Sequence, residues 1–161
     1  MGEVIRVGMA DLNVCRAPDK ITTLGLGSCI GLVLYSMRST ACGMVHVMLP
    51  DSSIMRNTEN PAKFADTGVK LLIDRLAAMG IRRTDLCAKM AGGAKMFTIK
   101  GGDDFLKIGE RNAEAVRAEL EKLRIPIISS DCGENYGRTI EFDPETRQLK
   151  ITSIGKAVKY I

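Results

Sequence analysis

Among the residues able to do covalent chemistry, Cys29 has the most suggestive setting. It lies in the run Gly27-Ser28-Cys29-Ile30-Gly31, which has the form of a G-x-S-x-G nucleophile elbow with cysteine in place of serine. Glycines on both sides of a nucleophile permit a sharp turn that exposes the side chain and directs backbone N–H groups toward one point. The turn at Gly27 and Ser28 therefore predicts a binding place for an oxyanion beside a cysteine nucleophile.

The chain has a single histidine, His46, and its position supports this interpretation. Two strand-like runs, 30–35 and 42–48, are joined by a short polar turn. If they form an antiparallel hairpin, Cys29 lies opposite residues 46 to 48, so that His46 is its direct partner or one diagonal step away. An imidazole and a thiol at that separation can share a proton, and a thiolate–imidazolium pair is the usual form of an activated cysteine.

A third group normally orients such an imidazole. Asp51 and Ser52 follow His46 closely, and Thr22 and Thr23 precede the cysteine on a neighbouring strand. Spacing alone does not choose among these four side chains.

Other interpretations of the same residues compete with this one. Cys29 and His46 can be ordinary buried structural residues, or they can bind a metal together with Cys42, although no pattern of supporting ligands accompanies them. A dinucleotide fingerprint would need a third glycine where Ile30 stands, and no Lys-Ser/Thr pair follows the glycines as a phosphate-binding loop requires. We expect the other four cysteines to be structural and the protein to need neither metal nor cofactor.

The composition excludes several further classes. A single histidine rules out the two-histidine zinc motifs, and the absence of a C-x-x-C pair argues against a zinc ribbon or a thioredoxin-like motif. The odd number of widely spaced cysteines, five, favours reduced thiols in a cytoplasmic protein. The net charge of +4 comes from scattered basic residues, and aromatic residues make up only 4% of the chain, so we expect no nucleic-acid partner. No signal peptide and no apolar run of membrane-spanning length is evident, so we expect no membrane insertion.

The elements that must position these residues follow from hydrophobic periodicity. Helical spacing of apolar residues predicts amphipathic helices over 61–79 and 110–123. Strand-like runs are predicted at 4–8, 21–26, 30–35, 42–48, 86–91, 125–130, 138–142 and 149–153. The run 30–35 is apolar on both faces, as in a strand between two layers, whereas 138–142 alternates. Many strands and two helices predict a layered α+β domain that spans residues 1–161.

At these residues the sequence resembles the CheD family of chemoreceptor glutamine deamidases. Five stretches in the expected order carry the resemblance: TLGLGSCIG (Thr23–Gly31), HVMLPDS (His46–Ser52), MAGGAKMF (Met90–Phe97), IGERN (Ile108–Asn112) and DCGENYGRTIEF (Asp131–Phe142). One departure is Glu134, where the family tends to have a second glycine after Gly133. It lies outside the proposed catalytic motif.

The resemblance implies an α/β/β sandwich with mixed sheets, related to toxin-type Cys-His deamidases. It assigns the nucleophile to Cys29, the histidine to His46 and the orienting threonine to Thr23. It also implies a cytoplasmic enzyme that converts glutamine side chains of methyl-accepting chemoreceptors to glutamate through a cysteine thioester, with a side activity on glutamate methyl esters. The alternative is a binding module that docks receptor helices and a CheC-type phosphatase.

Overall fold

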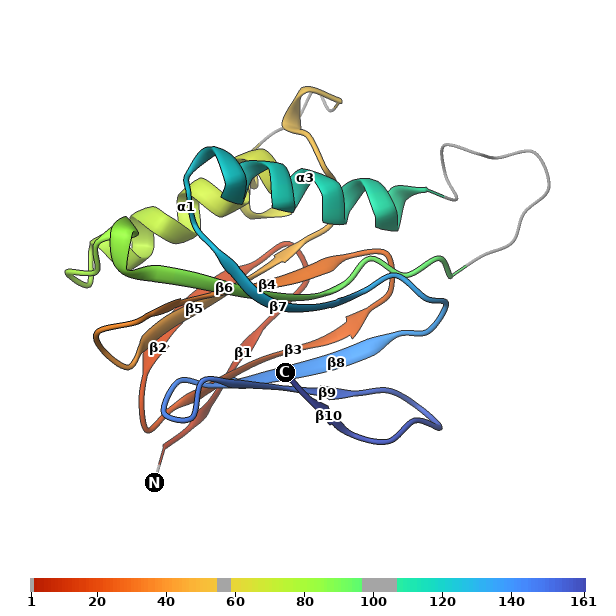
Figure 1. Cartoon of the computed structure of the whole chain (residues 1–161). Coiled ribbons are helices and arrows are strands. Elements are labelled where there is room, and N and C mark those ends of the chain that lie inside the picture. Colours follow the sequence, from red (N-terminus) through yellow and green to blue (C-terminus); the bar gives the residue numbers. More distant parts are fainter. Residues whose placement is uncertain (1, 55–58, 97–106) are drawn as a thin grey trace.

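The computed structural model describes residues 2–54, 59–96 and 107–161 (Figure 1). Its strands are β1 (Val4–Val7), β2 (Leu12–Arg16), β3 (Lys20–Leu26), β4 (Ile30–Ser36), β5 (Ala41–Val47), β6 (Leu86–Gly92), β7 (Ile127–Cys132), β8 (Arg138–Asp143), β9 (Gln148–Thr152) and β10 (Lys159–Tyr160). The α-helices are α1 (Ala65–Ala77) and α3 (Ile108–Lys122), and short 3-10 turns cover Ser52–Ile54, Pro61–Lys63 and Arg83–Asp85. Phe97, the end of one stretch that carries the resemblance, lies outside the described residues.

The strands form two mixed sheets. The sheet with the order β2-β5-β4-β6-β7, here the central sheet, has the two helices on one face and the second sheet on the other (Figure 1). The second sheet, here the outer sheet, has the order β1-β3-β8-β9-β10. Each sheet contains one parallel pair, β6 with β7 and β1 with β3, among otherwise antiparallel neighbours. The predicted α+β fold with two amphipathic helices, mixed sheets and an α/β/β layering is confirmed.

The central strands are buried on both faces because each face packs against a different layer. Every residue of β4, β5 and β6 is buried. Along β4, Ile30, Leu32 and Leu34 join the core beneath the helices, whereas Val33 and Tyr35 join the core between the sheets. This alternation explains why the 30–35 run is apolar throughout, and it confirms the prediction of a strand between layers.

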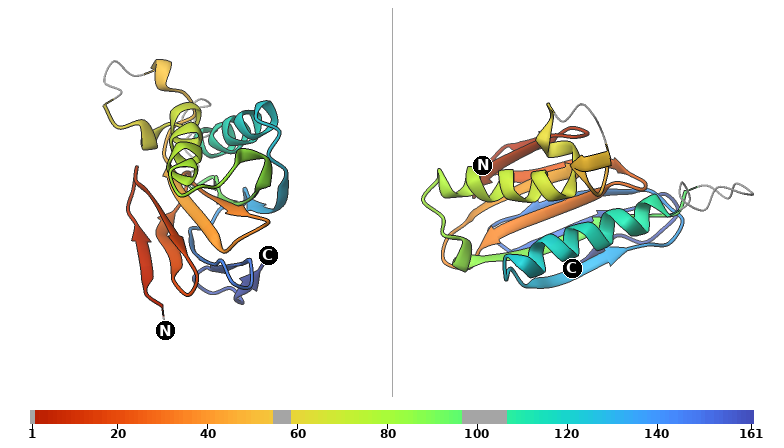
Figure 2. Two further views of the ribbon diagram at one scale, coloured as in Figure 1. Left: turned by 90° about the vertical axis from the view of Figure 1, so that its left-hand side faces the viewer. Right: turned by 90° about the horizontal axis from the view of Figure 1, so that it is seen from above.

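Helices α1 and α3 lie side by side over the central sheet (Figure 2). The segment predicted as one helix over 61–79 is divided, because Phe64 is extended, fully buried and bridged to Leu49, so that the α-helix begins only at Ala65. The helix predicted over 110–123 is observed as α3, which begins two residues earlier than predicted, at Ile108. None of the helices in the described ranges has the length and apolar character needed to cross a membrane.

Three strands differ from the prediction. The run predicted at 125–130 starts as β7 at Ile127, because the N–H of Ile125 still bonds to the Leu120 carbonyl at the end of α3. Strand β2 was not predicted: it lies at an edge of the central sheet and carries polar residues at Asn13 and Arg16. The two-residue β10 was also missed, since it is too short for a periodic pattern.

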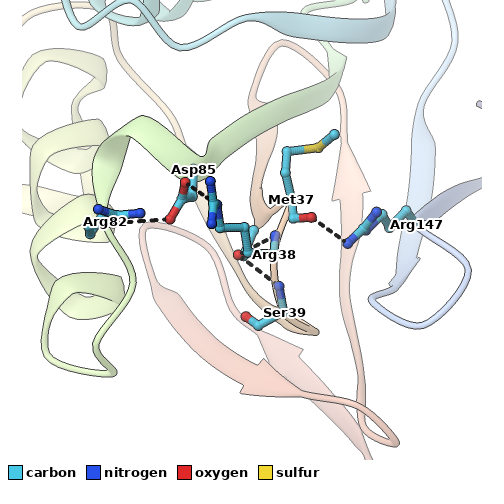
Figure 3. Close-up of polar contacts among 7 residues, drawn as sticks. Met37, Arg38, Ser39, Arg82, Asp85 and Arg147 are labelled. Atoms are coloured by element: carbon cyan, nitrogen blue, oxygen red, sulfur yellow. Dashed lines mark hydrogen bonds and ion pairs between the residues drawn. The ribbon is translucent and has the colours of Figure 1, made fainter.

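The turn between β4 and β5 is fixed by polar contacts from two neighbouring segments (Figure 3). Arg38 and Arg82 both pair with Asp85, at 3.2 and 3.3 Å. The Arg147 guanidinium donates to the Met37 carbonyl at 3.2 Å. These contacts hold the closed end of the β4–β5 hairpin. Different contacts, described below, hold its open end.

Arg138 is a buried cation in the core. Its Nε donates to Asp131 at 3.0 Å, and its Nη1 donates to the carbonyls of Gly133 and Gly92 at 3.0 and 3.4 Å. Burial raises the pKa of Asp131, but hydrogen bonds from Lys159 and Arg138 and their positive charges bring it below its ordinary value of 3.8. A carboxyl whose pKa is depressed by folding adds stability above its unfolded pKa, and this stability is lost as the pH falls through the folded pKa.

We therefore predict that Asp131→Asn lowers the free energy of unfolding at neutral pH by about 3 kcal/mol, because Arg138 keeps a buried charge without its counter-ion. Urea unfolding measured between neutral and acid pH checks this. The difference between wild type and variant should begin to shrink below about pH 4, where Asp131 becomes protonated in the unfolded chain, and should go on shrinking until the pH passes the lower pKa of the folded protein. A difference that stays constant across this range would contradict the assignment.

Candidate functional site

The hairpin predicted from the sequence is present, and its register decides how Cys29 and His46 lie. Gly31 pairs with His46 and Ile30 with Val47 in the β4–β5 ladder. Extending this register by one residue sets Met48 opposite Cys29. His46 is therefore the diagonal neighbour of Cys29, a relation that places Cα atoms about 7–8 Å apart and side chains closer.

Both side chains lie on the face of the central sheet that meets the outer sheet. Cys29 packs against the apolar core between the two sheets, and it is partly exposed. His46 is completely buried and contacts a residue of the outer sheet. The nucleophile candidate thus lies at the edge of the inter-sheet core, where solvent can reach it, and the imidazole lies further inside.

Thr23 is the residue that contacts His46. Its Oγ1 donates to the Val7 carbonyl at 2.8 Å and lies 2.8 Å from Nδ1 of His46. A hydroxyl has one hydrogen, so the oxygen accepts from His46 and Nδ1 carries the proton. Nε2 then holds the free lone pair of the neutral ring, and it is buried without a hydrogen-bond partner among the described residues. This tautomer makes Nε2 the atom able to take a proton.

The other candidates for orienting the imidazole are engaged elsewhere. Ser52 donates from its hydroxyl to Asp66 at 2.7 Å, and Asp51 accepts from the Ser53 N–H at 2.8 Å. Thr22 donates to the Ile140 carbonyl at 2.7 Å. Spacing could not choose among these four side chains. The structure does, because among the four only Thr23 contacts His46.

The close approach of the outer sheet at this point depends on Gly31. A Cβ added there would lie 2.5 Å from Cδ1 of Ile140 and 3.4 Å from Cγ2 of Thr23. Because Gly31 lies directly opposite His46 in the ladder, its missing side chain leaves room for β3 to reach the imidazole. The second glycine of the elbow pattern thus serves the position of the histidine as well as the turn.

Burial shifts the pKa values of Cys29 and His46 in opposite directions, and each shift disfavours the charged form of the group. It raises the pKa of the Cys29 thiol above its ordinary value of 9.0 and lowers the pKa of His46 below 6.5. Both shifts favour the uncharged form. At rest, burial therefore favours a thiol and a neutral imidazole over the thiolate–imidazolium form.

Asn112 is a site residue that sequence reasoning missed. Its Nδ2 donates to the carbonyls of Ser28 and Met48, at 3.0 and 2.9 Å, and thereby joins the nucleophile turn to the end of β5. The available signal was a polar residue on the apolar stripe of a helix, four positions before Val116. Gly27 and Ser28 lie in the turn as predicted and are partly exposed.

A metal site is not seen in the described ranges: no three side chains of His, Cys, Asp or Glu gather closely enough to hold an ion. Cys42, which we considered as a ligand with Cys29 and His46, instead lies beside Cys15, with 3.6 Å between the two sulfurs.

Comparison with known proteins gives full-length relatives. The family model described as CheD chemotactic sensory transduction matches residues 48–153. The chain is 58% identical over 161 residues to the probable chemoreceptor glutamine deamidase CheD of Lachnoclostridium phytofermentans, covering all of both chains. It is 50% identical over 162 residues to the chemoreceptor glutamine deamidase CheD of Halalkalibacterium halodurans, again over all of both chains. The Bacillus subtilis protein of that name is 49% identical, over 98% of this chain and 96% of that one.

Among solved structures, a Neisseria meningitidis protein of family DUF152 matches with a TM-score of 0.49 and 12% identity, over 80% of this chain and 64% of that one. No conclusion rests on this weaker likeness.

The contact between Thr23 and His46 predicts a difference between two adjacent variants. Thr23→Val removes the acceptor of the buried His46 Nδ1–H together with the hydroxyl bond to the Val7 carbonyl, whereas Thr22→Val removes only the hydroxyl bond to the Ile140 carbonyl. Each buried unpaired group costs about 1–3 kcal/mol. Urea unfolding should show the larger loss of stability for Thr23→Val. Equal losses for the two variants would show that Thr23 does not hold the imidazole.

The lowered pKa of His46 predicts a pH dependence of stability. Between its folded pKa and 6.5 the unfolded chain binds a proton at His46 that the folded chain does not, so stability falls as the pH drops below about 6.5. The slope contributed by this group is at most about 1.4 kcal/mol per pH unit. Because the chain has one histidine, the comparison of wild type with His46→Gln isolates the effect. Identical slopes for the two proteins would refute it.

Proposed function

Because the chain belongs to the CheD family, we propose that it is a chemoreceptor glutamine deamidase, a protein-glutamine glutaminase that acts in the cytoplasm on the helices of methyl-accepting chemoreceptors. The observation that carries the proposal is the hydrogen bond of Thr23 to His46. It supports a base at Nε2, on the same face of the sheet as the partly exposed Cys29.

In the proposed reaction, His46 Nε2 takes the thiol proton as the Cys29 sulfur attacks the carbon of the glutamine carboxamide. Because both groups are uncharged at rest, proton transfer and attack occur together on the bound substrate. The carbonyl oxygen gains a negative charge, which the N–H groups of Ser28 and Cys29 stabilise.

The same imidazole then acts as the acid. His46 returns the proton to the amide nitrogen, the C–N bond breaks, and ammonia leaves a thioester on Cys29. A water molecule gives a proton to Nε2 as its oxygen attacks the thioester carbon. Collapse of this second intermediate breaks the C–S bond, the thiol regains its proton from His46, and glutamate is released.

Two further activities belong to this proposal. A glutamate methyl ester presents the same acyl carbon with methanol as the leaving group, so we propose ester hydrolysis as a side activity. We also propose that a CheC-type phosphatase binds this protein, as the resemblance implies. The kinship of the fold with bacterial toxin deamidases stays a prediction.

The alternative is a binding module that docks receptor helices and the phosphatase without turnover. The two functions differ in the fate of the receptor glutamine. An adaptor leaves it unchanged, whereas the enzyme adds one negative charge to the receptor at each site and so alters a helical signalling bundle.

We predict that the wild type converts glutamine to glutamate in a receptor cytoplasmic fragment, which adds about one mass unit per site, and that Cys29→Ala abolishes the conversion. In ¹⁸O water the product should carry one heavy oxygen from hydrolysis of the thioester. Hydroxylamine should intercept the thioester as a hydroxamate. Cys87→Ala is the matched control, since Cys87 is buried in the inter-sheet core away from the turn. Conversion by Cys29→Ala would overturn the mechanism, and no conversion by wild type would favour the adaptor.

A further inference from the structure

The nucleophile turn is held through its carbonyl groups. The carbonyl of Gly27 accepts from the N–H of Ala94 at 2.9 Å, and the carbonyl of Cys29 accepts from the N–H of Gly93 at 2.9 Å. Both donors belong to the segment that follows β6. Two of the three peptide planes of the turn are therefore fixed by backbone contacts.

The third plane is fixed by a side chain. Asn112 of α3 is fully buried, and its Nδ2 donates its two hydrogens to the carbonyl oxygens of Ser28 and Met48. Since both partners are acceptors, the nitrogen end of the amide must face them. Its Oδ1 is buried without a hydrogen-bond partner among the described residues, so the two Nδ2 bonds are what offset the cost of burying this amide.

The orientation of these carbonyls determines where the N–H groups point. In a planar trans peptide the C=O and the following N–H point in opposite directions. Asn112 draws the Ser28 carbonyl toward α3, so the N–H of Cys29 points away from α3, the side on which the Cys29 side chain packs against the inter-sheet core. The bond from Ala94 fixes the N–H of Ser28 in the same manner. Neither N–H donates to a residue within 2–54, 59–96 or 107–161.

We propose that Asn112 is a positioning residue for catalysis: by holding the Ser28 carbonyl, it aims the N–H of Cys29 at the oxyanion of the reacting carboxamide. This inference rests on the proposed function and deepens it. The bond to Met48 adds a second effect, because it ties the turn to the strand that carries His46, at the open end of the hairpin.

Close packing of two backbones brings α3 within reach of the turn. A Cβ added to Gly109 would lie 2.6 Å from the Ala94 carbonyl oxygen, and one added to Gly93 would lie 2.8 Å from the Gly109 carbonyl oxygen. Gly109→Ala must therefore shift the helix or the 93–94 segment, which gives an independent way to disturb the Asn112 contact.

The test compares two reactions of Cys29. Deamidation develops an oxyanion, whereas alkylation by iodoacetamide does not. Asn112→Ala should lower kcat for deamidation by about 10²–10³-fold, as expected for loss of one oriented oxyanion donor, with little change in KM. Alkylation of Cys29 at about pH 9 should stay within about threefold of wild type. Gly109→Ala should also lower kcat for deamidation more than it lowers the rate of alkylation, but by a smaller factor than Asn112→Ala.

The matched control is Val116→Ala, which truncates a fully buried apolar side chain one turn along the same helix. It should destabilise the protein and leave both reactions near wild-type rates. Urea unfolding of the variants separates loss of fold from loss of catalysis.

Asn112→Asp supplies a second readout through pH. The ionised carboxylate offers no donor to two carbonyl oxygens, but the protonated acid can donate to one of them. The ratio of kcat for Asn112→Asp to kcat for wild type should therefore rise as the pH falls, whereas the ratio for Asn112→Ala should not.

Three outcomes overturn the inference. The first is that Asn112→Ala retains kcat within about threefold of wild type, and the second is that it loses deamidation and alkylation equally, which would mean that Asn112 only preserves the turn. If the wild type itself does not deamidate the receptor fragment, the proposed function fails and this inference fails with it. If the wild type deamidates the fragment and Asn112→Ala does so equally well, the inference about Asn112 fails but the proposed function stands.

Discussion

The imidazole of His46 receives its orientation from a hydroxyl of the other sheet. Thr23 lies on β3 of the outer sheet, His46 on β5 of the central sheet, and 2.8 Å separates Oγ1 from Nδ1. Because the hydroxyl hydrogen is donated to the Val7 carbonyl, the Thr23 oxygen accepts from Nδ1 of His46. The neutral ring therefore carries its proton on Nδ1. The packing of the two sheets is thus part of the site. The glycine at position 31 favours this packing, because an added Cβ would lie 2.5 Å from Cδ1 of Ile140 and 3.4 Å from Cγ2 of Thr23.

The same burial that fixes the imidazole also determines how the pair works. A charged pair at rest would place two ions at the edge of an apolar core, and burial opposes both charges. In the proposed mechanism, charge therefore appears only when a substrate is bound. In the proposed reaction the N–H groups of Ser28 and Cys29 stabilise the new negative charge, and the hydrogen bonds of Asn112 and the 93–94 segment to the carbonyls of the turn would set their orientation before the substrate arrives. Electrostatic preorganisation of this kind costs no rearrangement during the reaction.

Much of this arrangement could be predicted from local pattern. The doubly apolar run of β4, the alternation of β8 and both amphipathic helices follow from periodicity. The hairpin predicts that Cys29 and His46 are direct or diagonal neighbours, and the observed register makes them diagonal. The choice of Thr23 over Thr22, Asp51 or Ser52 could not be made from spacing, because it depends on how two sheets pack. Asn112 is distant from Cys29 in the chain, and only the tertiary contact of α3 with the turn reveals its purpose.

The tautomer of His46 is the central claim, and the single histidine makes it directly measurable. Nitrogen-15 NMR of the uniformly labelled protein near neutral pH should show one pair of imidazole nitrogens, with Nδ1 protonated and Nε2 unprotonated. In Thr23→Val this preference should be lost. A proton on Nε2 in the wild type, or an imidazolium with both nitrogens protonated, would contradict the account.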